Sequence, residues 1–178
     1  DKTCYSPLKA KKFSEELHKY FEREKNTFLY DICIKDHSDK ITAEGGYPGF
    51  LSKLLNHLSC KYNLKDKTVV DVGCGTGELT VWMNKLGYSA HGVEIQEELF
   101  NLSKILAVEN GLPKETFIFN SGKKLPFEDK SADIITMFSV LEHIDDDTLK
   151  NILIPEFLRI SRGVIFVLCK APGLRSGG

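Results

Sequence analysis

Four residues at alternate positions near the middle of the chain could bind a ligand. They are Asp71, Gly73, Gly75 and Gly77. Glycine has no Cβ, so these positions accept positive φ angles and allow a ligand to approach the backbone closely. The β-branched run 69–72, which contains Asp71, precedes the three glycines, and the stretch 78–87 follows them. This order predicts a buried strand, a tight turn and a helix whose free N–H groups face a bound group.

The spacing of these glycines differs from the dinucleotide fingerprint. That fingerprint is G-x-G-x-x-G, with its third glycine three places after the second. Counting from Gly75, the third place is occupied by Glu78, which is too large for close packing and would repel a pyrophosphate. The pattern therefore disfavours a nicotinamide oxidoreductase. A generic strand-to-helix turn of another α/β protein stays an alternative.

A further acid, Glu94, could bind a ribose. It ends the second predicted strand, 88–94, and lies 21 residues after Gly73. An acid about 20 residues beyond the first glycine suits a bidentate hydrogen bond to adjacent ribose hydroxyls. The spacing indicates a nucleoside-containing cofactor without distinguishing its class. An exposed acid at a helix N-terminus is the alternative interpretation.

The elements that would position these residues alternate along the chain. Strands are predicted at 69–72, 88–94, 117–119, 134–138 and 164–168, and helices at 78–87, 96–110 and 145–161, the last of them ended by Arg162 and Gly163. Repeated strand–helix units predict an α/β fold, a doubly wound and mostly parallel sheet with helices on both faces. Ligands of such sheets bind at the carboxyl ends of the strands. Gly73, Glu94, Ser121 and Ser139 all follow predicted strand ends, so they would gather along one edge.

Residues 1–44 and 45–178 are predicted to differ in role. An amphipathic pattern over 8–21 predicts an N-terminal helix, which would form a helical cap or a lid on the main domain. A glycine-rich breaker cluster separates it from a second predicted helix, 50–62. Tyr47 lies in this cluster and would contact the ligand if the cluster crosses the mouth of the site. A simple linker is the alternative.

Composition and charge favour an ordinary globular domain. The 178 residues are 42% hydrophobic and carry a net charge of −1, so nucleic acid is not the expected partner. Five scattered cysteines without a C-x-x-C pair suit a reducing cytoplasmic environment. No apolar run reaches the length of a membrane helix, so no membrane association is expected. The aspartates at 145–147 are interpreted as helix-start charges, and no metal is expected.

The glycine stretch resembles motif I of the class I S-adenosylmethionine-dependent methyltransferases, D/E-x-G-x-G-x-G. Two further blocks carry the resemblance, Leu125-Pro126-Phe127 with Ser131-Ala132-Asp133, and Val140-Leu141-Glu142-His143-Ile144. They look like the LPF…S-x-D and VLEHI blocks of the small-molecule branch of this family. The resemblance covers residues 45–170. It implies a Rossmann-like fold, S-adenosyl-L-methionine as cofactor and S-adenosyl-L-homocysteine as product.

By this resemblance, the cofactor would lie along the carboxyl edge of the sheet. The residues implied to hold its methionine part are Asp71, Gly73, Cys74, Gly75, Gly77, Phe138 and Ser139. Glu94 would bind the ribose, and Ile95 would pack against the adenine. Relatives often carry an acid after the third strand, where this chain has Ser121. A hydroxyl accepts a weaker hydrogen bond than a carboxylate, and the backbone N–H of Gly122 would stand beside it.

The resemblance implies methyl transfer to a nucleophilic O, N or C atom of a small molecule by in-line displacement. The protein must align the nucleophile and remove its proton where it has one. His143 is the candidate base, because imidazole titrates near neutral pH, and a structural hydrogen bond is the alternative. A methyltransferase-like module that binds the cofactor or a partner without turnover is the alternative function.

The end of the chain departs from the family pattern. Members usually add two strands after the fifth, whereas only residues 169–178 follow the fifth predicted strand here. We therefore expect the C-terminal strands to be missing. The apolar segment 164–168 would then form an open sheet edge, which further chain covers or which pairs with another molecule of the protein.

Overall fold

The computed structural model describes the sheet, its flanking helices and part of the N-terminal region. The described residues are 7–24, 40–41, 53, 55, 57, 66–121 and 123–168. Most of the second predicted helix, 50–62, lies outside them, and so do Tyr47 and Gly122. The proposed division of the chain after residue 44 also falls outside them, so it stays a prediction.

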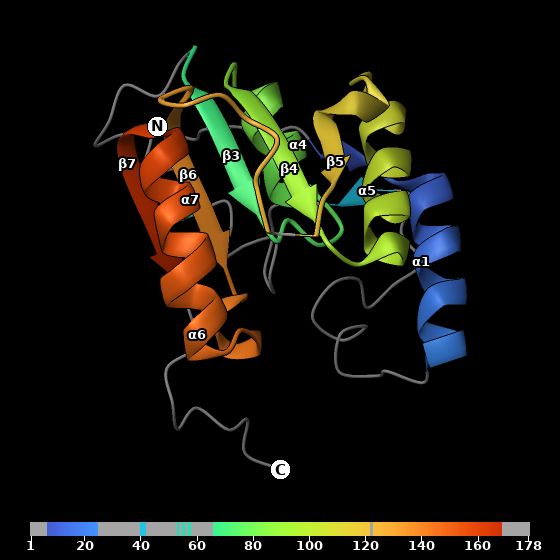
Figure 1. The fold of residues 1–178 in the computed structure, drawn as a ribbon. Helices are drawn as coiled ribbons and strands as arrows, with labels where there is room; N and C mark the ends of the chain where they lie inside the picture. Colours follow the sequence, from blue (N-terminus) through green and yellow to red (C-terminus); the bar gives the residue numbers. More distant parts are fainter. Residues whose placement is uncertain are drawn as a thin grey trace.

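Five parallel strands form the central sheet in the order β5-β4-β3-β6-β7 (Figure 1). Their bounds are Thr68–Val72 for β3, Ser89–Glu94 for β4, Phe117–Phe119 for β5, Ala132–Phe138 for β6 and Ser161–Leu168 for β7. The central strands β3 and β6 are almost wholly buried, as apolar runs in a sheet covered on both faces should be. The doubly wound, Rossmann-like α/β fold is confirmed, with β3 at its centre and β6 and β7 on one side.

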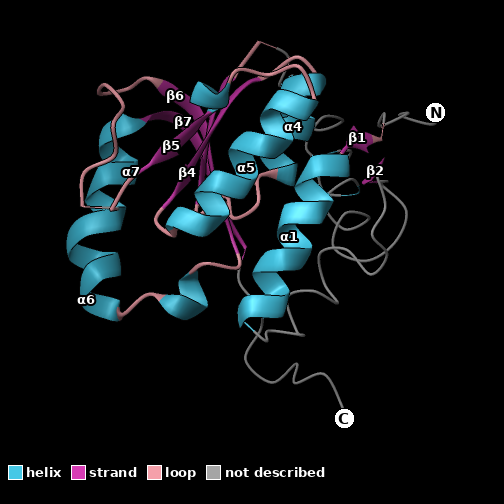
Figure 2. Ribbon diagram, turned by 90° about the vertical axis from the view of Figure 1, so that its right-hand side faces the viewer, coloured by secondary structure: helices cyan, strands magenta, loops and turns pink. Residues whose placement is uncertain are grey.

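Helices cover both faces of the sheet, which gives three layers (Figure 2). On one face lie α4 (Glu78–Lys85) and α5 (Glu97–Glu109), and on the other α6 (Asp146–Thr148) and α7 (Ile154–Ile160), joined by a π-helical turn at Leu149–Leu153. Asp145 caps α6, since its Oδ1 accepts a hydrogen bond from the backbone N–H of Thr148 at 2.8 Å. The interpretation of the aspartate run as a helix start is confirmed, with Asp145 as the N-cap and Asp146 and Asp147 in the first turn.

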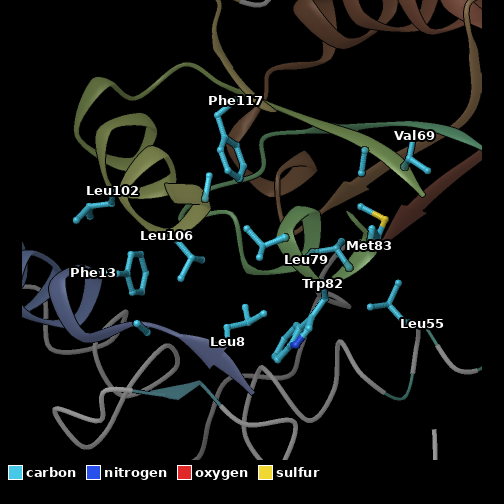
Figure 3. Close-up of a cluster of buried hydrophobic side chains, with 14 of the residues drawn as sticks. Leu8, Phe13, Leu55, Val69, Leu79, Trp82, Met83, Leu102, Leu106 and Phe117 are labelled. Atoms are coloured by element: carbon cyan, nitrogen blue, oxygen red, sulfur yellow. The ribbon is translucent and has the colours of Figure 1, made fainter. Parts of the chain in front are cut away.

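Each face of the sheet has its own hydrophobic cluster. Because neighbouring strand residues point to opposite faces, Val69 packs under α4 and α5 whereas Val70 packs under α7. Figure 3 shows the first cluster, where Trp82 and Phe117 lie with side chains from the N-terminal region. Leu8 and Phe13 of this N-terminal region, and Leu55 of the stretch that follows it, are all fully buried. The described N-terminal residues therefore share the core of the main domain.

Helix α1 (Lys11–Glu24) is capped by a residue of another helix. The carboxylate of Glu109, at the end of α5, accepts hydrogen bonds from the backbone N–H groups of Lys12 and Phe13 at 2.8 and 2.9 Å. These N–H groups have no partner within their own helix, so an acid near them also favours the positive end of the helix dipole. The cap holds the start of α1 against the end of α5.

At its other end, α1 reaches the first turn of α5, where Arg23 Nη2 lies 3.9 Å from Glu98 Oε1. The two helices are thus antiparallel. The predicted helix began at residue 8, which was wrong: Leu8–Lys9 form strand β1, paired antiparallel with β2 (Lys40–Ile41). The apolar period of a helix and the buried position of a short strand coincide at Leu8.

The prediction that Arg162 and Gly163 end the last helix was wrong. Helix α7 ends at Ile160, and both residues lie in β7. A Cβ on Gly163 would collide with the carbonyl oxygen of Asp133, beside an irregularity in the pairing of β6 with β7. The glycine therefore serves close strand packing rather than helix termination.

Side chains of α7 bind the backbone of the LPF block, so this block has a structural role. Arg159 donates to the carbonyl oxygens of Phe127 and Leu125 at 2.8 and 3.0 Å. Glu156 accepts from the backbone N–H of Leu125 at 2.7 Å and is paired with Arg159, which lowers the pKa of the Glu156 carboxyl. Asp133 binds Arg162 through both carboxylate oxygens, and this lowers the pKa of Asp133 to about 2. These contacts anchor the long loop before β6.

Strand β7 is the last strand on its side of the sheet among the described residues, as expected. Its Val164 and Val167 are 38% and 43% exposed. Coverage of this edge by further chain, or self-association through it, stays a prediction. None of the helices in the described part of the chain is long and apolar enough to cross a membrane.

Candidate active site

The carboxyl ends of β3, β4, β5 and β6 lie at one edge of the sheet, toward which the strands in Figure 1 point. Gly73 follows β3, Glu94 ends β4, Ser121 follows β5 and Ser139 follows β6. The structure therefore brings these four residues to one edge. The loop between β3 and α4, residues 73–77, is called the glycine loop below.

The three glycines of the glycine loop have positive φ angles, 70° for Gly73, 57° for Gly75 and 90° for Gly77. Their surroundings differ. A Cβ on Gly73 would collide with Val140, and one on Gly77 would collide with Phe117, whereas one on Gly75 would meet no atom within 4 Å. Two glycines thus permit close packing within the protein, and Gly75 alone of the three faces open space.

Asp71 is the last acid before the glycine loop, and its side chain is buried among polar partners. The residue is 3% exposed, and its carboxylate accepts hydrogen bonds from Thr80 Oγ1 at 2.9 Å and Thr136 Oγ1 at 2.8 Å. Burial raises the pKa of Asp71 to about 6, although both hydroxyls act in the opposite direction. Glu94 and Glu78 raise it further, because they are nearby acids.

Two more titratable residues, Glu78 and Cys74, line a hollow together with Asp71. Glu78 is 4% exposed, its Oε2 accepts from Thr76 Oγ1 at 2.6 Å, and burial raises its pKa. Burial and the neighbouring acids raise the pKa of the Cys74 thiol well above its usual range, so the thiol stays protonated at neutral pH. The hollow is lined by Asp71, Gly73, Cys74, Glu78, Leu79 and Phe138. Its polar lining is acidic.

Glu94 joins two loops through its carboxylate. The residue is 5% exposed; its Oε2 accepts a hydrogen bond from the backbone N–H of Gly75 at 2.8 Å. Its Oε1 accepts from the N–H groups of Ile95 at 2.8 Å and Gln96 at 2.9 Å. The same carboxylate thus braces the glycine loop and the start of α5. The described residues supply three of the four hydrogen bonds that the carboxylate can accept, which leaves one accepting position on Oε2 beside Gly75 rather than the two that the predicted bidentate contact to a ribose needs.

An apolar surface lies beside Glu94. Ile95 is 58% exposed and Phe119, at the end of β5, is 51% exposed. The ring centroids of Phe119 and Phe100 are 5.6 Å apart, and the ammonium of Lys104 lies 4.1 Å from the Phe100 centroid. Ser121 lies two residues after the end of β5 and is exposed. Exposed flat and branched apolar side chains of this kind suit the face of an aromatic ring.

The segment after β6 completes the edge. Phe138 lines the hollow beside Asp71, and Ser139 has a φ of 54°, which is uncommon for a residue other than glycine. Val140, next in the chain, packs against Gly73 and so joins this segment to the glycine loop. His143 lies in a short 3₁₀ turn, Leu141–His143, and is exposed. The described residues contain no group of three or more His, Cys, Asp or Glu placed to hold a metal ion.

Comparison with known proteins identifies the family. Residues 70–160 match the model of a methyltransferase domain. This segment spans half of the chain and includes both the glycine loop and the β6 edge. The chain belongs to the class I S-adenosylmethionine-dependent methyltransferase family.

Individual relatives agree with this assignment. The chain is 34% identical over 124 residues to an uncharacterized methyltransferase of Schizosaccharomyces pombe, covering 65% of this chain and 44% of the relative. It is 29% identical over 89 residues to a ubiquinone biosynthesis O-methyltransferase of Colwellia psychrerythraea, covering 50% of this chain and 36% of the relative. The chain thus spans less than half the length of either relative.

A solved structure supports the fold of the methyltransferase domain. The structure of this chain matches the crystal structure of a SAM-dependent methyltransferase from Aquifex aeolicus with a TM-score of 0.60 and 19% sequence identity. The match covers 72% of this chain and 68% of the Aquifex chain. At this identity, the likeness is one of fold.

Sequence reasoning missed four residues that the methyltransferase domain places around Asp71: Glu78, Leu79, Thr80 and Thr136. In the sequence, Glu78 served only as evidence against a pyrophosphate-binding site. Thr136 did leave a signal, because it is a polar residue in the otherwise apolar run 134–138 of β6. Its pairing with Asp71 depends on the register of β3 against β6, which no local pattern contains.

Proposed function

We propose that this methyltransferase domain binds S-adenosyl-L-methionine at the glycine loop and transfers its methyl group to a nucleophilic O, N or C atom of a small molecule. The supporting observation is the acidic hollow at the carboxyl edge of the sheet. Three buried carboxylates, Asp71, Glu78 and Glu94, surround the loop. The methyl donor carries a sulfonium and an ammonium, so its charge complements the hollow. A dinucleotide carries an anionic pyrophosphate, which the same carboxylates would repel.

The chemistry of the residues fits the donor at each part of the edge. Gly75 leaves open space where a ligand can approach the backbone, and Asp71 offers a carboxylate to the cationic methionine part. Glu94 keeps one accepting position for a ribose hydroxyl. Ile95 and Phe119 offer apolar surface to the adenine. Ser121 would accept from the adenine amino group, with Gly122 beside it.

When bound, the cofactor supplies a methyl group on a positively charged sulfur, which is already reactive toward nucleophiles. The remaining work of the protein is to align the acceptor, exclude water and remove a proton where the acceptor carries one. Phe138 and Ser139 would line the reactive end. His143 is the proposed base, because it is an exposed imidazole on the turn that follows this segment.

The substrate class is inferred more indirectly. The relative from Colwellia is named for O-methylation in ubiquinone biosynthesis, so small phenolic hydroxyl compounds come first among the acceptors to test. Nucleic acid is not the proposed substrate, because the net charge of the chain is −1. The second candidate is a non-catalytic module that holds the cofactor or a partner, which the hydroxyl of Ser121 in place of an acid favours.

The test is a methyl-transfer assay with methyl-labelled S-adenosylmethionine and a panel of phenols, amines and carbon nucleophiles. The proposal predicts label in at least one small acceptor and equal formation of S-adenosylhomocysteine. His143→Gln should lower turnover without weakening donor binding. Donor binding with no transfer to any acceptor of the panel would favour the non-catalytic module. Label in nucleic acid alone would contradict the proposed substrate class.

A further inference from the structure

Two threonines donate hydrogen bonds to the carboxylate of Asp71. Thr136 Oγ1 donates to Asp71 Oδ1 at 2.8 Å, and Thr80 Oγ1 donates to Asp71 Oδ2 at 2.9 Å. Thr136 is the residue paired with Asp71 across β3 and β6, so their side chains lie on the same face of the sheet. Thr80 comes from α4, which packs on that face. Each carboxylate oxygen thus has its own hydroxyl donor.

All three residues are buried. Asp71 is 3% exposed, Thr136 is 1% exposed and Thr80 is fully buried. The charged groups that act on Asp71 are Glu94 and Glu78, and both are acids. A buried carboxylate beside other acids tends to take up a proton, and hydrogen bonds to its charged form oppose this tendency. The two hydroxyls are therefore the features that favour the ionised form.

We infer that Thr80 and Thr136 are positioning residues, which hold Asp71 ionised and fixed and so set the pH range in which the site accepts a cationic ligand. The inference rests on the proposed function, because the cation is the methyl donor. It adds two residues that act through Asp71 and need no contact with the donor. Burial raises the pKa of Asp71 to about 6, so the balance lies near physiological pH.

The expected effect follows from this balance. Removal of one hydroxyl should raise the pKa of Asp71 by about one unit, since a hydrogen bond to a charged group stabilises that charge. If only ionised Asp71 binds the donor, the wild-type Kd should be roughly twofold higher at pH 6 than at pH 8. For a variant with a pKa one unit higher, the same ratio should be roughly tenfold. At pH 8 the two proteins should bind alike.

The experiment compares Thr136→Val and Thr80→Val with Thr136→Ser, which keeps the hydroxyl. Thr116→Val is the matched control, because Thr116 is also a buried threonine but lies in the short turn before β5. The first measurement is a ¹³C NMR titration of the Asp71 carboxyl in the ligand-free protein, assigned with Asp71→Asn. The second is the calorimetric Kd of S-adenosylhomocysteine and S-adenosylmethionine at pH 6 and pH 8.

The inference predicts an upward pKa shift and a steeper pH dependence of donor binding in both valine variants, with neither change in Thr136→Ser or Thr116→Val. An unchanged pKa of Asp71 in both valine variants would overturn it. So would a shifted pKa together with donor binding that does not depend on pH. If the wild-type protein binds no donor at either pH, the proposed function falls, and the NMR titration still decides whether the threonines control Asp71.

Discussion

The carboxylate of Glu94 accepts a hydrogen bond from the backbone N–H of Gly75, with 2.8 Å between Oε2 and N. This contact joins the end of β4 to the middle of the glycine loop. It also means that the residue proposed to bind the ribose shapes the loop proposed to hold the methionine part. The two halves of the proposed cofactor site are therefore coupled through one side chain.

Glu94→Ala should weaken donor binding and destabilise the protein together. The loss of a charged acceptor should weaken binding by about 1.5–3 kcal/mol. Three backbone N–H groups also lose their acceptor, which should cost about 1–3 kcal/mol of unfolding free energy. Calorimetry and urea unfolding measure the two effects. Glu94→Gln keeps one acceptor oxygen, so it should unfold more like the wild type; wild-type donor affinity in Glu94→Ala would refute the ribose role.

Gly75→Val should abolish donor binding while the protein stays folded. Its side chain would enter the open space beside the loop, at a strain cost of about 1–2 kcal/mol for a positive φ. Gly73→Ala is the informative comparison, because its Cβ collides with Val140 and the variant should lose more stability. Val140→Ala should partly restore the Gly73→Ala protein. Unchanged donor affinity in Gly75→Val would mean that the glycine loop is not the cofactor site.

Much of the fold could be predicted from local patterns, since each βα unit carries its own strand run, turn and helix. The glycine loop could be predicted because glycines at these positions indicate positive φ angles, whatever residues surround them in the fold. Which glycine faces open space could not be predicted, because Val140 and Phe117 reach Gly73 and Gly77 from distant parts of the chain. The role of Gly163 was predicted wrongly for the same reason, because the Asp133 carbonyl that it packs against belongs to another strand.

Asp71→Asn should stabilise the ligand-free protein above pH 6. The pKa of Asp71 is raised to about 6 in the folded state, so the folded protein binds more protons than the unfolded chain between about pH 4 and 6. The stabilisation that protonated Asp71 gives the folded state is fully present near pH 4. It is lost as the pH rises through 6, which lowers the free energy of unfolding by up to about 3 kcal/mol. Asparagine carries no charge to bury. Unfolding curves at pH 4 and pH 8 check this, and a variant less stable than wild type at pH 8 would contradict the burial argument.

Glu109→Ala should loosen the N-terminal helix. The substitution removes the acceptor of two N–H groups at the start of α1, and loss of a helix cap costs about 1–2 kcal/mol. Amide hydrogen exchange should rise in residues 12–21 more than in the central strands. Glu98→Ala is the matched control, because its exposed contact with Arg23 should contribute less than about 1 kcal/mol. Equal exchange in the two variants would mean that Glu109 does not hold α1 in place.

The central claim is that the acidic edge of the sheet binds S-adenosylmethionine, and calorimetric titration of the wild-type protein tests it most directly. The titration uses S-adenosylmethionine, S-adenosylhomocysteine and NAD⁺ in turn, with Gly75→Val as the control protein. We expect one site for S-adenosylmethionine and its demethylated product, no heat from NAD⁺, and no binding to Gly75→Val. Binding of NAD⁺ alone, or equal binding of the methyl donor to both proteins, would contradict it.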